Sequence, residues 1–167
     1  EYSYEDLRDV IYHYGEERLS REIASEIIDR RPLETTTELR KEVESVVHGQ
    51  YQIKSVARVF QGIRIEVNRE LDMLRNVLEQ SLDQLKVDGR IVAISYHSLE
   101  DRIVKRFYDT GDHEREVDSH KHRKPLNPIE EISGGIVRPT EEEIEKNPAA
   151  RSAKMRVAQK IDQPEVS

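Results

Sequence analysis

Cysteine and tryptophan are both absent from this sequence of 167 residues, and aromatic side chains make up only 5% of it. The absence of cysteine excludes disulfides, cysteine-ligated metal sites and cysteine nucleophiles, and it is compatible with the cytoplasmic location that we predict. No stretch approaches the ~18 consecutive apolar residues of a transmembrane helix. The chain begins at Glu1 with neither an initiator methionine nor an apolar signal segment, which we interpret as a piece of a longer chain or a processed form.

The charge is uneven along the chain. The net charge is −7, and residues 1–50 carry 13 acidic against 7 basic residues. Residues 51–64 and 146–160 contain several basic residues and no acidic one. We predict that these two stretches, if they meet in the fold, form a local positive surface on an acidic protein. The alternative is that both are ordinary solvated surfaces.

The first half of the sequence has the apolar spacing of helices. Ser3 with Asp6, and Thr35 with Glu38, have the spacing of capping boxes at helix starts. Apolar residues at steps of three or four then continue over residues 56–85, which predicts one long helix or two helices that meet near Gly62. We expect the first helix to end at Gly15 and the third at Gly49. The second helix is expected over residues 16–30, where Pro32 stops it.

The periodicity changes after residue 88. Residues 90–96 are an apolar run of strand length, which suggests a central parallel strand buried on both faces. Ser98 with Asp101 predicts the cap of the next helix, and residues 109–128 read as a long polar loop. Residues 129–138 and 153–161 are expected to form an antiparallel pair beside that strand. The fold class is therefore α/β.

The turn after the predicted strand is the first candidate site. His97 and Ser98 lie at the carboxyl end of the strand, where open α/β sheets bind ligands. The alternative is that both are only turn and cap residues. A serine hydrolase is disfavoured because no G-x-S-x-G elbow is present. The other histidines of interest lie in the polar loop beside three cations, so we predict no metal site there: His113, His120 and His122.

A polar stripe on the predicted long helix is the second candidate. Arg58, Gln61 and Asn68 follow helical spacing with Ile65, and Arg64 lies beside them. Such a stripe suits contacts to phosphate and base edges. The structural alternative is a set of ion pairs with the acidic helices of residues 1–50.

Three segments resemble one known family. They are Arg58-Val-Phe-Gln-Gly-Ile-Arg-Ile-Glu-Val-Asn68, the run from Gly89 to Phe107, and Asn147-Pro-Ala-Ala-Arg-Ser-Ala-Lys-Met-Arg156. All three, in this order, are similar to the bacterial small-subunit rRNA cytosine-N4 methyltransferases (RsmH, formerly MraW). Shorter matches at residues 14–18 and 35–39 extend the resemblance over nearly the whole chain. The chain departs from the family at Gly62 (usually Ala), at Tyr96 (usually Phe) and at residues 53–55, where a His-Pro pair is common.

The resemblance implies a Rossmann-like class I methyltransferase fold with a helical insert. Residues 1–65 would be the insert that recognises substrate, residues 66–163 the C-terminal part of the sheet, and residues 164–167 a tail. In the family's strand order 3-2-1-4-5-7-6, this chain would supply strands 5, 6 and 7 only. Residues 90–96 would be strand 5, and because its neighbour is missing we expect either a longer parent chain or self-association along this edge.

The implied function is methylation of N4 of a cytosine in the decoding centre of small-subunit rRNA. The family's S-adenosylmethionine loop has no counterpart here, so the donor site is expected on a missing N-terminal part and the segment alone is expected to be inactive. The expected partner is the small ribosomal subunit, with no membrane contact. The alternatives are a non-catalytic RNA-binding or assembly module and a helical adaptor. The RNA-binding candidates are Arg58, Gln61, Arg64, Asn68, Arg151, Lys154 and Arg156.

Overall fold

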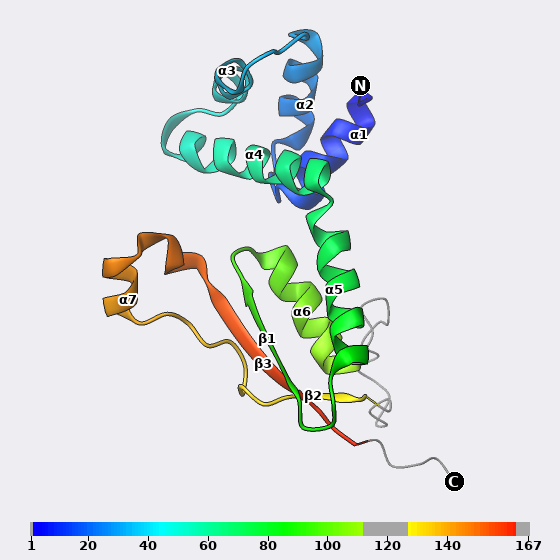
Figure 1. The fold of residues 1–167 in the computed structure, drawn as a ribbon. Coiled ribbons are helices and arrows are strands. Elements are labelled where there is room, and N and C mark those ends of the chain that lie inside the picture. The colour runs from blue at the N-terminus through cyan, green and yellow to red at the C-terminus, as the bar shows by residue number, and fades with distance from the viewer. Residues whose placement is uncertain (1, 112–126, 163–167) are drawn as a thin grey trace, which may run out of the picture. The chain divides into compact units, whose positions relative to one another are not determined.

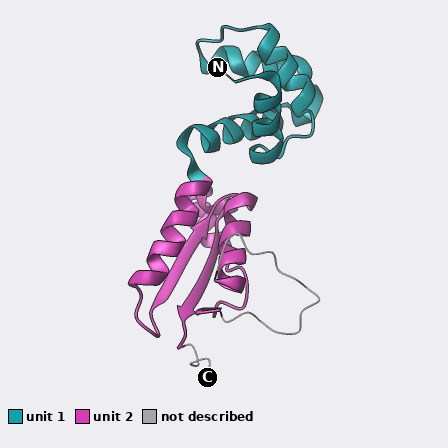
Figure 2. Ribbon diagram, turned by 90° about the vertical axis from the view of Figure 1, so that its right-hand side faces the viewer, with its two compact units in different colours: residues 1–70 teal, residues 71–167 magenta. Residues whose placement is uncertain are grey.

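A computed structural model describes residues 2–111 and 127–162 of the protein. Its contacts divide the chain into two compact units, residues 1–70 and residues 71–167, where we expected a boundary after residue 65 (Figure 2). None of the helices described is long and apolar enough to cross a membrane. The three loop histidines and the predicted tail lie outside the described residues.

Unit 1 is helical, as the spacing predicted. Both capping boxes are present: the Ser3 hydroxyl accepts from the Asp6 N–H, and the Thr35 hydroxyl accepts from the Glu38 N–H. The second helix begins at residue 20 and not 16, and Gly49 begins a 3₁₀ turn instead of ending the third helix. The elements are α1 (Tyr4–Asp9), a π-helical turn (Val10–Tyr14), α2 (Ser20–Asp29), α3 (Thr36–Val46), a 3₁₀ turn (Gly49–Tyr51) and α4 (Gln52–Asn68) (Figure 1).

Two glycines let the segment that follows the π-helical turn pack closely on α4. A Cβ added to Gly62 would lie 2.9 Å from the backbone nitrogen of Gly15, and one added to Gly15 would lie 2.7 Å from the Arg58 carbonyl oxygen. Because neither residue has a side chain, the two backbones can approach each other at this point. The core of the unit is an aliphatic cluster of Leu7, Ile11, Ile23, Ala24, Ile27, Val43, Val47 and Val59.

The apolar periodicity over residues 56–85 belongs to two helices, but they do not meet near Gly62. Gly62 lies inside α4, and the break comes at Arg69, whose φ of 53° is left-handed. Helix α5 (Glu70–Gln84) then begins. The prediction of the junction was wrong because Gly62 serves helix packing and not a change in chain direction.

Unit 2 is a three-stranded antiparallel sheet with helices, which confirms a mixed α/β protein. Strands β1 (Arg90–Ser95), β2 (Ile129–Glu131) and β3 (Lys154–Lys160) lie in the order β1-β3-β2. The predicted antiparallel pair forms as β2 with β3, although β2 has only three residues and Val137 contacts Met155 of β3 through a separate, isolated bridge. The other elements are α6 (Ser98–Thr110), α7 (Glu141–Lys146) and a 3₁₀ helix (Pro148–Ser152).

Strand β1 is buried on one face only. Ile91 and Ala93 pack against the apolar cluster that α5 and α6 form with the sheet, while Val92 and Ile94 are 57% and 56% exposed. The strand pairs with β3 alone and is antiparallel to it. The prediction of a parallel strand buried on both faces is therefore wrong for the residues described, because both helices that cover the sheet pack on its inner face. Helix α6 also extends through Thr110, into the predicted loop.

Candidate functional site

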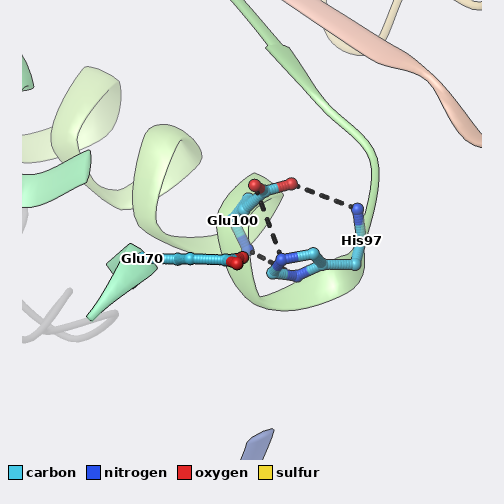
Figure 3. A group of neighbouring side chains, drawn as sticks. All are labelled: Glu70, His97 and Glu100. Atoms are coloured by element: carbon cyan, nitrogen blue, oxygen red, sulfur yellow. Dashed lines mark hydrogen bonds and ion pairs between the residues drawn. The ribbon is translucent and has the colours of Figure 1, made fainter. Parts of the chain in front are cut away.

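The turn between β1 and α6 is held by a reciprocal pair of hydrogen bonds (Figure 3). The His97 Nδ1 accepts from the Glu100 N–H at 3.4 Å, and Glu100 Oε2 accepts from the N–H groups of Tyr96 and His97 at 2.8 and 3.3 Å. The predicted Ser98–Asp101 cap is wrong by one residue, because Ser98 is already helical. His97, an unusual residue at this position, takes the place of the serine.

Both nitrogens of the His97 imidazole lie near Glu100 of the same turn. The His97 side chain is 8% exposed, and its Nε2 lies 3.5 Å from Glu100 Oε1. Ser98, the first residue of α6, is half-buried beside it. Both residues do lie at the carboxyl end of the strand, as predicted, but the described contacts are those of a rigid helix start. A direct role toward a substrate stays a prediction.

One turn into α6, Asp101 joins a buried ion-pair network. The Arg156 guanidinium from β3 donates to both Asp101 oxygens, at 2.7 and 3.3 Å, and to Glu131 Oε1 of β2 at 3.1 Å. The side chains of Arg156 and Asp101 are only 7% and 13% exposed. This fork ties the helix that follows β1 to both other strands of the sheet.

The network shifts the pKa values of its members. Burial raises the pKa of the Asp101 carboxyl, but the hydrogen bonds and charge of Arg156, with the charge of Lys154, bring that pKa below its ordinary value. Hydrogen bonds to Asp101 raise the pKa of Arg156, against the opposing effect of burial. The ionised state is therefore favoured for both partners at neutral pH.

The basic residues of the C-terminal segment divide by exposure. Arg156 is buried in the network, and the Lys154 Nζ lies 3.7 Å from Asp101 Oδ2. Arg151, on the 3₁₀ helix, is exposed and forms no ion pair with any residue that the structure describes. Of the three predicted RNA contacts in this segment, Arg151 is thus the one with its charge turned to solvent.

The four predicted RNA contacts of α4 also have partners within unit 1. Arg58 lies 3.4 Å from Glu17, and its side chain remains 49% exposed. Arg64 donates to both oxygens of Glu70, at 2.8 and 3.1 Å, and Asn68 donates to the same carboxylate. Gln61 donates to the Tyr14 carbonyl at 3.3 Å, while Ile65 of the stripe is buried in the core. The ion-pair alternative with residues 1–50 applies to Arg58; the RNA roles stay predictions.

Sequence reasoning missed Glu17 as the partner of Arg58. Glu17 is 3% exposed, and its carboxylate accepts from the Leu19 N–H at 3.1 Å and from Arg58. Burial raises its pKa, but the hydrogen bonds from Leu19, Ser55 and Arg58 bring the pKa below its ordinary value. The sequence contains no signal for this role, because an acidic residue in a charged segment is expected to be exposed.

Two connections among the described residues join a strand to a helix, and neither is built like a loop that holds a methyl donor. Nucleotide-type ligands are held in α/β proteins by a glycine-rich loop that joins a strand to a helix. The turn from β1 to α6 contains no glycine. Gly134 and Gly135 follow β2 with positive φ, but nothing lies within 4 Å of a Cβ placed on either, so they form an open turn. Neither connection therefore has the geometry of a loop that holds S-adenosylmethionine.

Comparison with known proteins identifies the family of this chain. The chain matches the MraW methylase family over residues 1–161. The chain belongs to this family. The match confirms the resemblance that the three sequence segments indicated, and it includes both compact units.

Relatives of this methylase family carry the name ribosomal RNA small subunit methyltransferase H. The one from Dehalococcoides mccartyi is 44% identical over 172 residues, covering 98% of this chain and 48% of the relative. One from Coxiella burnetii (strain RSA 331) is 46% identical over 170 residues, covering 94% and 53%. One from Flavobacterium johnsoniae is 43% identical over 164 residues, covering 96% and 54%. The chain thus spans about half the length of these relatives.

Proposed function

We propose that this chain is part of an enzyme that transfers a methyl group from S-adenosylmethionine to N4 of a cytosine in the decoding centre of small-subunit rRNA, in the cytoplasm. The observation that carries the proposal is the family match over residues 1–161, with relatives named as small-subunit rRNA methyltransferases. The donor would bind to the half of the relatives that this chain does not span. When bound there, it supplies the electrophilic methyl group.

The sheet order supports the assignment of this chain to the C-terminal part of the methyltransferase fold. The order β1-β3-β2 agrees with strands 5, 7 and 6 of the family's sheet, with the last strand of the chain between the other two. On this assignment the turn at His97 lies at the carboxyl end of strand 5. It would form one wall of the crevice in which the nucleotide reacts.

The chain's own residues would position the RNA. The exocyclic amine of cytosine is weakly basic because its lone pair is delocalised into the ring, so its orientation matters more than its basicity. The Arg156 network and the His97–Glu100 bonds would keep the crevice wall rigid. Arg151 and Arg58, whose side chain is half-exposed, would contact phosphates.

The test measures RNA binding and methyl transfer separately. Anisotropy would report binding of a labelled decoding-region RNA to the chain, with Arg151→Ala expected to reduce both affinity and salt slope, the latter by about 1. A matched control is Lys146→Ala, whose ammonium already pairs with Glu142. Transfer would be assayed with tritiated S-adenosylmethionine on small subunits, after adding the donor-binding half of the Dehalococcoides relative.

The outcomes separate the two readings. Transfer that appears only with both halves, and that yields N4-methylcytidine by mass spectrometry, supports the enzyme. RNA binding without any transfer would support the alternative, a non-catalytic RNA-binding or assembly module derived from the family. Absence of both would overturn the proposal.

A further inference from the structure

Tyr51 presents an aromatic ring to solvent at the start of α4. The residue is 61% exposed and lies outside the aliphatic core of unit 1. Its side chain forms no hydrogen bond or ion pair with any residue that the structure describes. Its backbone is already helical, with φ of −90° and ψ of −13°, so the spacing of α4 applies to it. Packing within the described part of unit 1 therefore gives this ring no role.

Two basic residues follow Tyr51 on the same side of α4. Lys54 lies three residues after Tyr51, and Arg58 lies four residues after Lys54. Side chains at these spacings are neighbours on a helix surface, with Cβ atoms about 5–6 Å apart. Residues 51–64 contain no acidic residue that could alternate with the two cations. Tyr51, Lys54 and Arg58 thus form a row along the helix, which we call the α4 row.

The positive charge of the α4 row is not cancelled by its neighbours. Lys54 is exposed and forms no ion pair with any residue that the structure describes. The Arg58 side chain pairs with the buried Glu17 but remains 49% exposed. On α3, which packs on α4, the carboxylate of Glu44 already pairs with Arg40 at 2.6 Å. The row therefore carries a net positive charge, which favours an anionic partner.

We propose that the α4 row binds a single-stranded segment of the substrate RNA, with one base stacked on the Tyr51 ring and neighbouring phosphates on Lys54 and Arg58. The inference rests on the proposed function, in which RNA is the substrate. An exposed ring beside cations is the combination by which proteins hold single strands, because every base has a π-face and every nucleotide carries a phosphate.

The exposed ring favours a single strand over a duplex. The bases of a duplex stack on one another and offer no face to a side chain, whereas the bases of loops and single strands can stack on tyrosine. A cytosine that is methylated must also leave its stack to enter an active site, and this leaves neighbouring nucleotides unstacked. The α4 row would hold such nucleotides, with little preference for their sequence.

A tryptophan reporter tests the stacking directly. The chain has no tryptophan, so Tyr51→Trp introduces a single indole at the proposed site. Titration of the 167-residue chain with an oligouridylate of about 12 nucleotides is expected to quench its emission, because a base would stack on the indole. The matched control is Tyr12→Trp, since Tyr12 lies in the same unit and is 55% exposed. The duplex of the same strand with oligoadenylate is expected to quench much less.

Anisotropy of the labelled oligouridylate measures the contribution of each side chain. Tyr51→Ala is expected to weaken binding by about tenfold, through the loss of one stacked base. Lys54→Ala is expected to reduce the salt slope by about 0.7, the value for one phosphate of a single strand. Its matched control is Lys41→Ala, an exposed lysine of α3. Circular dichroism would verify that every variant folds.

The outcomes test this site separately from the enzyme. The proposal is overturned if Tyr51→Trp is quenched no more than Tyr12→Trp, if Tyr51→Ala and Lys54→Ala bind like the parent, or if the duplex binds as well as the single strand. Methyl transfer by the two combined halves would still support the enzyme in each of these cases. Quenching at Tyr51→Trp without any methyl transfer would support the α4 row and count against the enzyme.

Discussion

Substitution of Arg156 by methionine should destabilise unit 2 more than any exposed change. The guanidinium satisfies two carboxylates, with Asp101 at 2.7 Å and Glu131 at 3.1 Å, and the three side chains are 7%, 13% and 17% exposed. Methionine keeps much of the volume but leaves both carboxylates without their main cation. Among the described residues, Lys154 remains 3.7 Å from Asp101, and the Ser133 hydroxyl still donates to Glu131 at 3.0 Å.

The expected cost follows from this burial. Removing one partner of a buried ion pair costs 3–5 kcal/mol, and because the Asp101 and Glu131 side chains keep some access to water we expect about 3 kcal/mol. With a urea dependence of about 1.5 kcal/mol per molar, the unfolding midpoint of unit 2 would fall by about 2 M. The exposed neighbour Arg151→Met should change stability by less than about 0.5 kcal/mol.

The pH dependence gives a second signature. In the parent, the lowered pKa of Asp101 adds stability that is present above its ordinary value of 3.8 and is lost as pH falls through the folded-state pKa. In Arg156→Met, burial dominates and raises the Asp101 pKa, so the folded state binds a proton more readily and the deficit shrinks from pH 7 to about pH 4.

Urea unfolding by far-UV circular dichroism would be combined with hydrogen exchange of residues 98–110 and 154–160, because a chain of two compact units need not unfold in one step. A deficit below about 1 kcal/mol at pH 7, or one that is equal at both pH values, would contradict the expected cost of breaking the buried ion pairs.

Three further substitutions probe the other contacts. Glu17→Gln should destabilise unit 1 by about 1 kcal/mol near neutral pH. The cost should shrink as pH falls below 4.5, because the Glu17 carboxylate of the parent then becomes protonated and loses the hydrogen bonds of its ionised form. Urea midpoints that differ equally at pH 7 and pH 3 would contradict this. Gly62→Ala should lower the thermal midpoint, because the added Cβ would lie 2.9 Å from the Gly15 backbone and we expect a clash of about 2 kcal/mol, against a helix-propensity gain of about 1 kcal/mol. An unchanged or higher midpoint would count against the close packing. His97→Ala should destabilise α6 by about 1 kcal/mol, whereas His97→Asn should not, because asparagine is a good N-cap. Hydrogen exchange of the α6 amides would measure both effects, and equal effects would show that the cap is unimportant.

The parts of the fold that sequence could predict are local. The boxes at Ser3 and Thr35 depend on residues three apart, and both form. The helix break at Arg69 escaped prediction because the apolar spacing of α4 continues into α5 without interruption. The one-sided burial of β1 also escaped it, since an apolar strand looks the same whether its outer face is covered or exposed.

The site shows the same limit. The strand-to-helix turn was located correctly because it depends on a change of periodicity at residues 88–98. The partner of Arg156 could not be predicted, because Asp101 lies 55 residues earlier in the chain and the two side chains meet only once β3 has joined the sheet. Arg58 and Glu17 are likewise separated by 41 residues. A basic residue in an acid-free stretch can therefore be a structural ion-pair partner instead of a contact for RNA.

The central strand of the sheet is the last one in the chain, and this affects folding during synthesis. In the part of the chain that the structure describes, β1 and β2 each pair with β3 alone, and this pairing forms only after residues 154–160 have been made. At about 5–20 residues per second, the edge of β1 that β3 covers then stays open for several seconds during synthesis. A nascent chain that stops before Lys154 lacks the strand that joins β1 to β2, so the described three-stranded sheet cannot form in it.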